Sequence, residues 1–362
     1  MIKNVVSLVA SAALALILFS SDVQPVNALA TGNHARVARH VASANKPGMR
    51  RRQSGTCRAR DESATSEYQW TSSATDQPTS TSTKQSWVAS VTSAASGAIS
   101  TAVKGKGHSY DSPCAVKAGI AWNMGETNAD ALASWASGGS RCFYTWSSWP
   151  NDAATKAGLN VLPMLHNNRP ETITEFHTNM AKYDPTTILA FNEPNEVGQS
   201  NMDPWAAAQS WKDNLEQYAQ QGFKIASPAC SSAASGKQWM KDFLDACKDC
   251  SISYIALHWY GTKADDFIAY VEDYIETFGL PVMVTEYAAQ DFSGQNRQLD
   301  DGGVWQFLKT TVDYLEGNSQ VVAYFAFGTL ADMAGVSESD RLLDAATYQP
   351  NALGSAYLKH FS

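Results

Sequence analysis

Residues 267–287 read FIAYVEDYIETFGLPVMVTEY, and this stretch holds one complete helix-to-strand unit. Its first half places apolar side chains at helical spacing from Phe267 to Phe278. Gly279 then ends the predicted helix, and Pro281 opens a short apolar run that predicts a buried strand. A helix followed directly by an apolar strand is typical of α/β proteins with a parallel sheet.

The same alternation recurs through residues 113–362, which we expect to form one domain. Eight short apolar runs lie here, and helix-like stretches separate them. The runs are Ala118–Trp122, Cys142–Trp146, Asn160–Leu165, Ile188–Phe191, Lys224–Ala229, Tyr254–Tyr260, Pro281–Tyr287 and Val321–Phe327. Eight strands at this spacing predict a (β/α)₈ TIM barrel, an α/β fold that typically needs about 250 residues. A doubly wound open sheet is the alternative, although no glycine-rich phosphate loop follows the first run.

One further helix can be predicted together with its first residue. Asp203 is a suitable N-cap, and Pro204 suits the first helical position. Apolar side chains then recur at helical spacing from Trp205 to Ala219. The pattern therefore predicts one helix over this range.

The first 112 residues do not follow this alternation, and they predict three separate segments. Residues 1–30 have a basic start, an apolar run and a final small-residue site, as a secretory signal peptide does. A membrane anchor is the alternative, but the run Val5–Phe19 is shorter than the roughly 20 residues that span a bilayer. We therefore expect a secreted protein that has no membrane contact after its signal is removed.

Residues 31–60 and 61–112 are the other two segments. Residues 1–60 contain nine Lys or Arg and one acidic residue, and the cluster Arg50–Arg52 predicts a propeptide with a basic cleavage site. Nucleic-acid binding is the alternative for this cluster, but the chain's net charge of −8 argues against polyanionic partners. Sixteen Ser or Thr lie between residues 71 and 101, so we predict a disordered linker over 61–112.

Six cysteines in a chain that we expect to be exported predict disulfide bonds. They are Cys57, Cys114, Cys142, Cys230, Cys247 and Cys250. Cys247 and Cys250 form a CxxC motif, which we interpret as a structural disulfide because no second CxxC or histidine pair accompanies it. Redox or zinc chemistry is the alternative for this motif, and the pairing of the six cysteines stays open.

Polar and aromatic residues gather where the predicted strands end, which is where a TIM barrel carries its functional residues. They include Trp122, Asn123, Tyr144, Trp146, His166, Asn167, Asn192, His258, Tyr260, Tyr287, Phe325 and Phe327. Aromatic rings stack on the C–H faces of a sugar, while amides and acids bind its hydroxyl groups. This mixture of side chains therefore suits a carbohydrate ligand.

Two glutamates at strand ends indicate the chemistry. Glu193 follows the fourth apolar run, and Glu286 ends the seventh. Cleavage of a glycosidic bond needs a proton donor for the leaving oxygen and a carboxylate against the developing positive charge. A lone glutamate at a strand end is more simply interpreted as one half of a surface salt bridge, but two at one barrel mouth favour catalysis. We expect the nearby acids Glu196 and Asp203 to be helix-start residues.

Three segments resemble a known family. Residues 191–195 (FNEPN), 250–260 (CSISYIALHWY) and 284–287 (VTEY) resemble glycoside hydrolase family 128, in the clan of retaining glycosidases with paired glutamates. These are compact fungal and bacterial β-1,3-glucanases, and the resemblance covers roughly residues 116–361. It implies that Glu193 is the acid/base and Glu286 the nucleophile.

The resemblance also implies roles for the surrounding residues. Asn192 would hydrogen-bond the 2-hydroxyl of the reacting sugar, Tyr260 would orient Glu286, and His258 would line the same pocket. The stacking platforms would be Trp122, Tyr144 and Trp146. Members of the clan usually offer a tryptophan at the end of strand eight, where this chain has Phe325 and Phe327, and Phe327 is the candidate for that place.

We therefore expect a monomeric endo-β-1,3-glucanase that acts on cell-wall glucan, outside the cell or associated with the wall, without a cofactor. Another β-glucan as substrate, or transglycosylation, is the first alternative. A non-catalytic glucan-binding protein is the second, and the retained glutamate pair argues against it. A metal enzyme that uses His166, His258 and nearby acids is the third. No HExxH motif is present, so we expect no metal.

Overall fold

The computed structural model describes residues 112–125, 129–182, 185–295 and 297–362. The predicted signal peptide (1–30), basic segment (31–60) and linker (61–112) lie outside these residues, except for Ser112 at the end of the linker. No helix in the described part of the chain has the length and apolar character needed to cross a bilayer.

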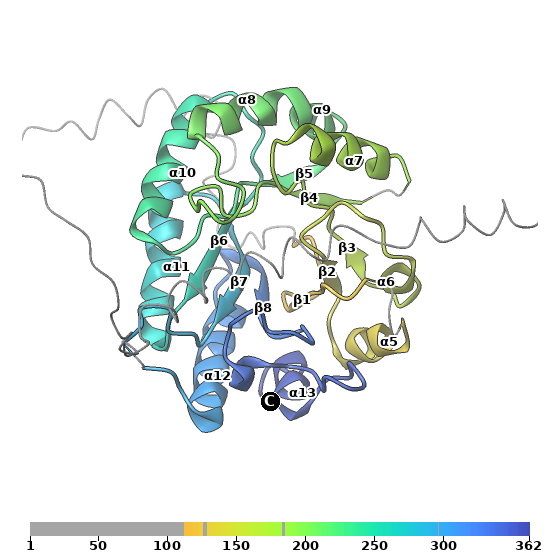
Figure 1. Cartoon of the computed structure of the whole chain (residues 1–362), viewed down its shortest axis with the longest axis vertical. Helices are drawn as coiled ribbons and strands as arrows, with labels where there is room; N and C mark the ends of the chain where they lie inside the picture. Colours follow the sequence, from red (N-terminus) through yellow and green to blue (C-terminus); the bar gives the residue numbers. More distant parts are fainter. Residues whose placement is uncertain (1–111, 126–128, 183–184, 296) are drawn as a thin grey trace, which may run out of the picture. The chain divides into compact units, whose positions relative to one another are not determined.

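Parallel strands and helices alternate through the described residues, and the helices lie outside the strands (Figure 1). The strands are β1 (Gly119–Ala121), β2 (Cys142–Tyr144), β3 (Asn160–Val161), β4 (Thr187–Leu189), β5 (Lys224–Ala226), β6 (Ile255–Tyr260), β7 (Val282–Ala288) and β8 (Val321–Ala326). The helices are α5 (Ala129–Gly138), α6 (Asp152–Lys156), α7 (Pro170–Met180), α8 (Pro204–Asn214), α9 (Glu216–Gln220), α10 (Ala234–Ala246), α11 (Ala264–Phe278), α12 (Asp301–Gly317) and α13 (Ala352–Leu358), with a 3₁₀ helix η1 (Glu338–Asp340). Each strand overlaps one predicted apolar run, so the predicted α/β alternation is confirmed.

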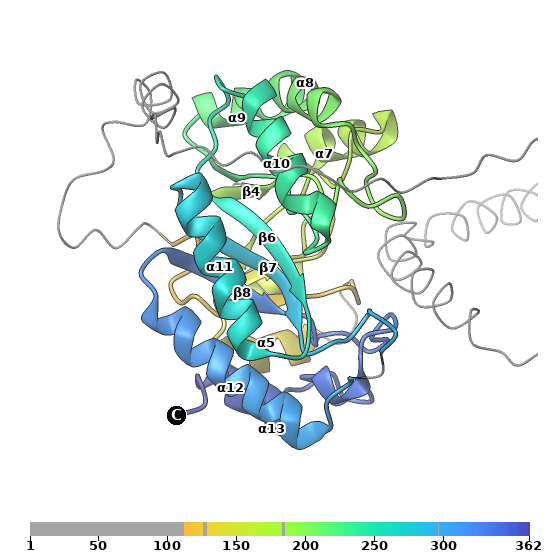
Figure 2. The same cartoon turned by 90° about the vertical axis from the view of Figure 1, so that its left-hand side faces the viewer.

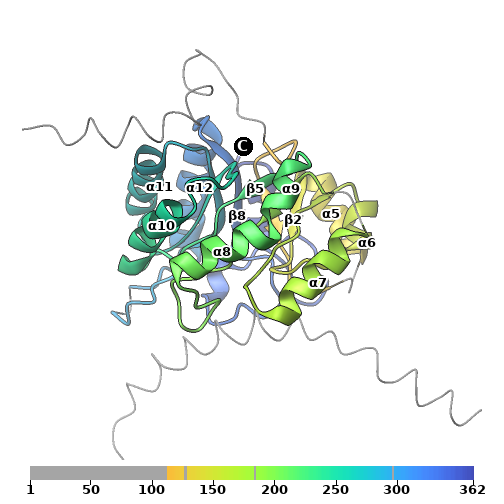
Figure 3. The ribbon, with the colours of Figure 1, turned by 90° about the horizontal axis from the view of Figure 1, so that it is seen from above.

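The strands pair in chain order. They form three parallel sheets, β1-β2-β3, β4-β5 and β6-β7-β8. Single parallel bridges connect the sheets, from Met164 to β4 and from Ala226 to Tyr254, and another links Ala118 to β8. Figure 3 shows α10, α11 and α12 on one side of the strands and α5, α6 and α7 on the other, and Figure 2 shows α11 and α12 across β6, β7 and β8.

Two predicted helix boundaries can be compared with the structure. Asp203 caps α8 as predicted, since its carboxylate accepts hydrogen bonds from the backbone N–H groups of Trp205 and Ala206. The prediction of a single helix up to Ala219 is wrong, because the helix is interrupted at Leu215, between α8 and α9. Gly279 ends α11 with a left-handed φ of 65°, which confirms the predicted end of this helix.

Side chains from the strands pack in two layers. Inside the strands lies a cluster of Tyr144, Trp146, Met283, Phe325 and Phe327 with smaller residues. Outside them, other strand residues pack against the helices. Consecutive residues of a strand point to opposite sides, so a shift of one position decides whether a side chain joins the inner or the outer layer.

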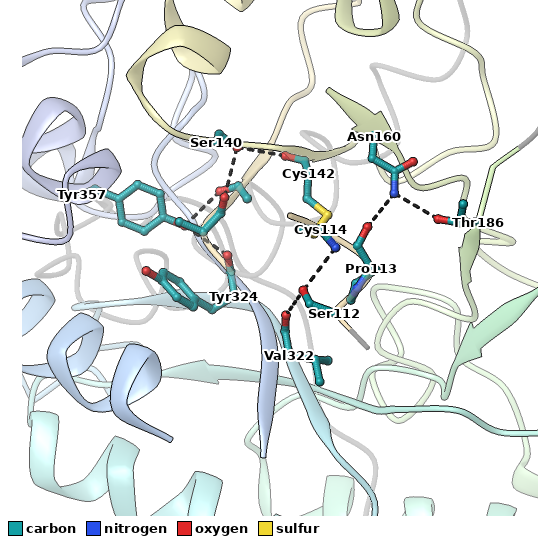
Figure 4. Close-up of a disulfide and its surroundings, with 12 residues drawn as sticks. Ser112, Pro113, Cys114, Ser140, Cys142, Asn160, Thr186, Val322, Tyr324 and Tyr357 are labelled. Carbon is teal, nitrogen blue, oxygen red and sulfur yellow. Dashed lines mark hydrogen bonds between the residues drawn. A yellow bond between two sulfur atoms is a disulfide. The ribbon is translucent and has the colours of Figure 1, made fainter. Parts of the chain in front are cut away.

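Among the described residues, four cysteines form two disulfides. Cys247 and Cys250 are bonded, which confirms the predicted disulfide of the CxxC motif. Cys114 and Cys142 join the segment before β1 to the start of β2 (Figure 4). Cys230 is free and buried. The Cys114–Cys142 disulfide, together with the hydrogen bond from Ser112 to the carbonyl of Val322, holds the start of the domain against the strands.

Candidate active site

Glu193 lies just after β4 on a constrained backbone. Its φ of 40° falls in the left-handed region that non-glycine residues rarely adopt, and such a conformation costs on the order of 1–3 kcal/mol. Two hydrogen bonds hold this turn: the Glu193 N–H donates to the carbonyl of Ala229, and the Asn192 N–H donates to the carbonyl of His166. The strain at Glu193 is therefore offset by contacts with the ends of two neighbouring strands.

Glu286 lies within β7 and is fully buried. The indole N–H of Trp146 donates to its Oε1 at 2.6 Å. The hydroxyl of Tyr260 donates to its Oε2, also at 2.6 Å. Burial first, and the neighbouring Glu286 second, raise the pKa of Tyr260 well above its usual value, so both donors are neutral groups that stabilise a negative charge on Glu286.

His258 lies between the two glutamates. Its Nδ1 is 2.9 Å from Oε1 of Glu193, and its Nε2 is 3.6 Å from Oε1 of Glu286. Complete burial lowers the pKa of His258, while the charge of Glu286 opposes this effect. The neutral imidazole is therefore favoured, and it can donate or accept a proton according to its tautomer.

Aromatic side chains surround these groups. The Phe327 ring packs edge-on against Trp146 and Tyr260, with centroids 5.9 Å away in each case. Phe325 packs against Tyr144 in the inner cluster, with ring centroids 5.1 Å apart. Of the two phenylalanines that replace the expected tryptophan, Phe327 is therefore the one beside the residues that hold Glu286.

The structure corrects two predicted sugar-binding residues. Trp122 is fully buried in the outer layer, where its indole N–H donates to the carbonyl of Gly125. Tyr287 is also buried there and stacks on Phe267 of α11, with ring centroids 5.1 Å apart. The geometry does not support these two predictions, because these side chains pack toward the helices rather than toward the strand ends.

A third correction concerns Tyr144. It is fully buried inside the strands, and its hydroxyl donates to the carbonyl of Thr285 at 2.7 Å. It therefore supports the backbone directly before Glu286 and offers no exposed face for stacking. Asn123 lies at the end of β1 and is buried, and no further contact defines its role.

Asn192 is held by a residue that the sequence did not indicate. Its Nδ2 donates to Oε1 of Gln199 at 3.3 Å, and both residues are buried. Its Oδ1 has no hydrogen-bond partner within the described part of the chain. Gln199 belongs to the irregular loop between β4 and α8, where no periodic pattern could have identified it.

One group of side chains among the described residues is close enough together to hold a metal ion. It consists of Glu193, His258 and Glu286, and one ligand atom of each lies within 4.8 Å of the others. The hydrogen bonds to this group describe a different arrangement. Both oxygens of Glu286 accept short bonds, and His258 contacts Glu193 directly. These contacts suit two carboxyl groups with different partners, Glu193 beside an imidazole and Glu286 between two neutral donors. His166 is not part of the group, and its Nδ1 lies 3.1 Å from the carbonyl of Trp146.

Several known proteins are similar to this chain. Alkali-sensitive linkage protein 1 of Schizosaccharomyces pombe is 29% identical over 235 residues, which is 64% of this chain and 42% of that protein. The chain thus spans about two fifths of the length of this curated relative. A curdlan-specific exo-β-1,3-glucanase from Blastomyces gilchristii, solved with glucose, is 29% identical with a TM-score of 0.53, over 67% of this chain and 97% of its own.

Two further solved structures come from bacteria. An endo-β-1,3-glucanase from Sorangium cellulosum has 25% identity and a TM-score of 0.58, over 68% of this chain and 98% of its own. An endo-β-1,3-glucanase from Amycolatopsis mediterranei, solved with laminaritriose, has 26% identity and a TM-score of 0.55, over 67% of this chain and 99% of its own. All three enzymes are members of glycoside hydrolase family 128. The family model described as glycosyl hydrolase catalytic core matches residues 119–357. The chain therefore belongs to the glycosyl hydrolase catalytic core family, as the resemblance to glycoside hydrolase family 128 predicted.

Proposed function

We propose that this chain is a secreted retaining endo-β-1,3-glucanase, with Glu193 as acid/base and Glu286 as nucleophile. One observation carries the proposal: a carboxyl oxygen of Glu193 lies within 4.8 Å of one of Glu286, at the ends of two strands. Retaining glycosidases keep their carboxyl groups about 5–5.5 Å apart, whereas inverting enzymes need about 6.5–9.5 Å to admit a water molecule. The short separation supports double displacement.

We infer that the eight strands form a closed (β/α)₈ barrel. The bridge from Ala118 to Tyr324 supports this, because it links the first strand to the last. The bridges at Met164–Leu189 and Ala226–Tyr254 link the remaining sheets in chain order. A doubly wound open sheet would leave two edge strands and would not join the first strand to the last.

The assignment of the two roles rests on what surrounds each carboxyl group. Glu286 accepts a hydrogen bond on each oxygen from Trp146 and Tyr260, and these bonds stabilise the anion that a nucleophile requires. Glu193 is bonded to His258, a group that can take up or release a proton. In the first step Glu193 protonates the leaving oxygen while Glu286 bonds to the anomeric carbon. In the second step Glu193 removes a proton from a water molecule. The water oxygen bonds to the anomeric carbon as the bond from this carbon to Glu286 breaks.

The substrate proposal rests on the relatives. The solved neighbours with at least 25% identity act on β-1,3-glucans, and one was solved with laminaritriose. The buried Oδ1 of Asn192, which has no partner in the described part of the chain, can accept a hydrogen bond from a sugar hydroxyl. Secretion and an extracellular or wall-associated location rest on the sequence of residues 1–30.

The direct test is to incubate the purified protein with laminarin, a β-1,4-glucan and a mixed-linkage glucan, and to size the products. We expect cleavage of laminarin into a series of oligosaccharides. Release of glucose or a single short product from the start would indicate exo action instead, which the relative from Blastomyces gilchristii shows. Intact laminarin beside a cleaved β-1,4-glucan would refute the substrate proposal.

A further inference from the structure

We propose that Trp146 is a positioning residue for the nucleophile, rather than a platform on which the sugar stacks. The proposal rests on the function proposed above, since it assigns Glu286 the nucleophilic role. Its first support is exposure: Trp146 is only 4% exposed. Its ring lies edge-on to Tyr144 and Phe327, with centroids 4.9 and 5.9 Å away. Too little of the ring face is open for a sugar to stack on it.

The second support is the contact of Trp146 with Glu286. Its indole N–H donates to Oε1 at 2.6 Å, a short hydrogen bond. Tyr260 holds the other oxygen at the same distance. With one donor on each oxygen, the carboxylate cannot rotate without breaking a bond, so its attacking direction is fixed.

The third support is the path of the contact across the molecule. β2 pairs with β1 and β3, while β7 pairs with β6 and β8, so β2 and β7 are not neighbours. Nevertheless two residues at the end of β2 reach two consecutive residues of β7. Tyr144 donates to the carbonyl of Thr285, and Trp146 donates to the side chain of Glu286. These two hydrogen bonds connect the end of β2, across the interior, to the nucleophile and to the residue before it.

The fourth support is the backbone of Trp146 itself. Its φ of 56° is a left-handed conformation that is costly for a tryptophan. The carbonyl of Trp146 lies 3.1 Å from Nδ1 of His166, at the end of the next strand. The strained backbone and this contact direct the indole N–H toward Glu286, and a residue that served only to pack the interior would not need them.

Kinetics of Trp146→Phe test the proposal on whichever glucan the wild-type protein cleaves. Phenylalanine keeps an aromatic ring but lacks the N–H donor. We expect kcat to fall about 10- to 100-fold, as for the loss of a hydrogen bond to a charged group, while KM changes less than about threefold. Tyr260→Phe, which removes the donor from the other oxygen, should show the same pattern. Tyr144→Phe should lower kcat by a smaller factor, because it loosens only the backbone.

Trp305→Phe is the matched control, because Trp305 lies on α12 with 41% of its surface exposed and packs against Phe361, away from the glutamates. Its kcat and KM should equal those of the wild-type protein. A rise in KM with unchanged kcat in Trp146→Phe would identify a stacking platform and overturn the proposal. Circular dichroism and melting curves of each variant separate these effects from loss of the fold.

A second measurement does not depend on turnover. In ¹H–¹⁵N spectra, the indole resonance that disappears in Trp146→Phe belongs to Trp146. We expect this proton to lie downfield of the exposed indoles and to move upfield in Glu286→Gln, because the charged acceptor is lost. An unchanged resonance would refute the contact. If the wild-type protein cleaves no glucan, the proposed function fails, and the spectra still decide whether Trp146 holds Glu286.

Discussion

The ends of β4 and β7 each carry a glutamate, but the two sites are built differently. Glu193 stands on a left-handed backbone turn beyond its strand, and its side chain meets the ionisable imidazole of His258. Glu286 lies within β7, where the pairing with β6 and β8 shifts in register, and it is fully buried, with two neutral groups holding its oxygens. A carboxyl group that exchanges protons has a partner that can do the same. Under the proposed mechanism, the carboxyl group that would attack carbon is fixed by partners that stay protonated.

Removing the carboxylate at the β7 end should have the largest effect. Glu286→Gln keeps the size of the side chain but cannot form the glycosyl ester, so we expect kcat to fall by roughly 10⁴- to 10⁶-fold. The reducing-sugar assay on laminarin measures this, and the melting curve should stay close to that of the wild-type protein. Turnover at the wild-type rate would end the assignment of Glu286 as nucleophile.

The matching change at the β4 end should have an effect that depends on the leaving group. For Glu193→Gln we expect kcat on laminarin to fall roughly 10²- to 10⁴-fold, the usual contribution of general acid–base catalysis. A β-glucoside with a dinitrophenolate leaving group needs no protonation, so its first step should keep nearly the wild-type rate. Added azide should then restore turnover by replacing the activated water. An equal loss with both substrates would contradict the acid/base role.

The β7 end is also tied to a titrating group. Asp340 of η1 accepts a hydrogen bond from the N–H of Ala289 at 2.8 Å, and its Oδ2 has no partner in the described part of the chain. Burial raises the pKa of Asp340 to about 7 from an unfolded value of 3.8, and the bond from Ala289 opposes this only partly. The folded protein therefore keeps this carboxyl protonated at pH values where the unfolded chain has already ionised.

It follows that the contribution of Asp340 to stability decreases as the pH rises from about 4 to about 7, by an amount on the order of a few kcal/mol, and then levels off. Asp340→Asn should remove most of this slope and should be the more stable protein at pH 8. Urea unfolding of both proteins at pH 5 and pH 8 measures the difference. The same pH dependence in both would show that Asp340 does not titrate in this range.

The smallest effect is expected at the loop after β4. Gln199→Ala removes the partner of the Asn192 amide, a neutral hydrogen bond of 3.3 Å. Such a bond contributes about 1 kcal/mol, so we expect kcat/KM on laminarin to fall about fivefold. Gln209→Ala, on the exposed face of α8, is a suitable control because its partner Asp213 lies on the same helix. If Gln209→Ala lowered kcat/KM as much as Gln199→Ala, the hydrogen bond between Gln199 and Asn192 would have no specific role.

The strands and the glutamate pair could be predicted from the sequence because both are local signals. Each strand is a short apolar run, and each glutamate stands at the end of one. The direction of individual side chains was harder to predict. Glu286 and Tyr287 are adjacent, yet Glu286 faces Glu193 and His258 while Tyr287 packs in the outer layer. Trp122 also packs in the outer layer, although the sequence predicted that it faces a sugar. The sequence alone does not show which residue ends a strand, so it does not show which side chains point inward there.

The contact of Trp146 with Glu286 could not be predicted from the sequence. Trp146 and Glu286 are separated by 140 positions, and nothing near either residue indicates their hydrogen bond. The surface showed a similar limit. Trp205 fits the apolar spacing of its predicted helix, yet it is 59% exposed, while Ala207 and Ala208 of the same helix are buried. Spacing identifies a helix, but only the packing of the chain decides which positions are covered.

Trapping the covalent intermediate tests the central claim most directly. The full chain would be incubated with a 2-deoxy-2-fluoro-β-laminaribiosyl fluoride, which slows the second step, and its peptides analysed by mass spectrometry. We predict that Glu286 displaces the anomeric fluoride, so that its peptide carries one 2-deoxy-2-fluoro-laminaribiosyl group, and that Glu286→Gln carries no label. A label on Glu193 would contradict the assignment of roles. An unlabelled protein that cleaves laminarin with inversion of the anomeric centre would contradict double displacement.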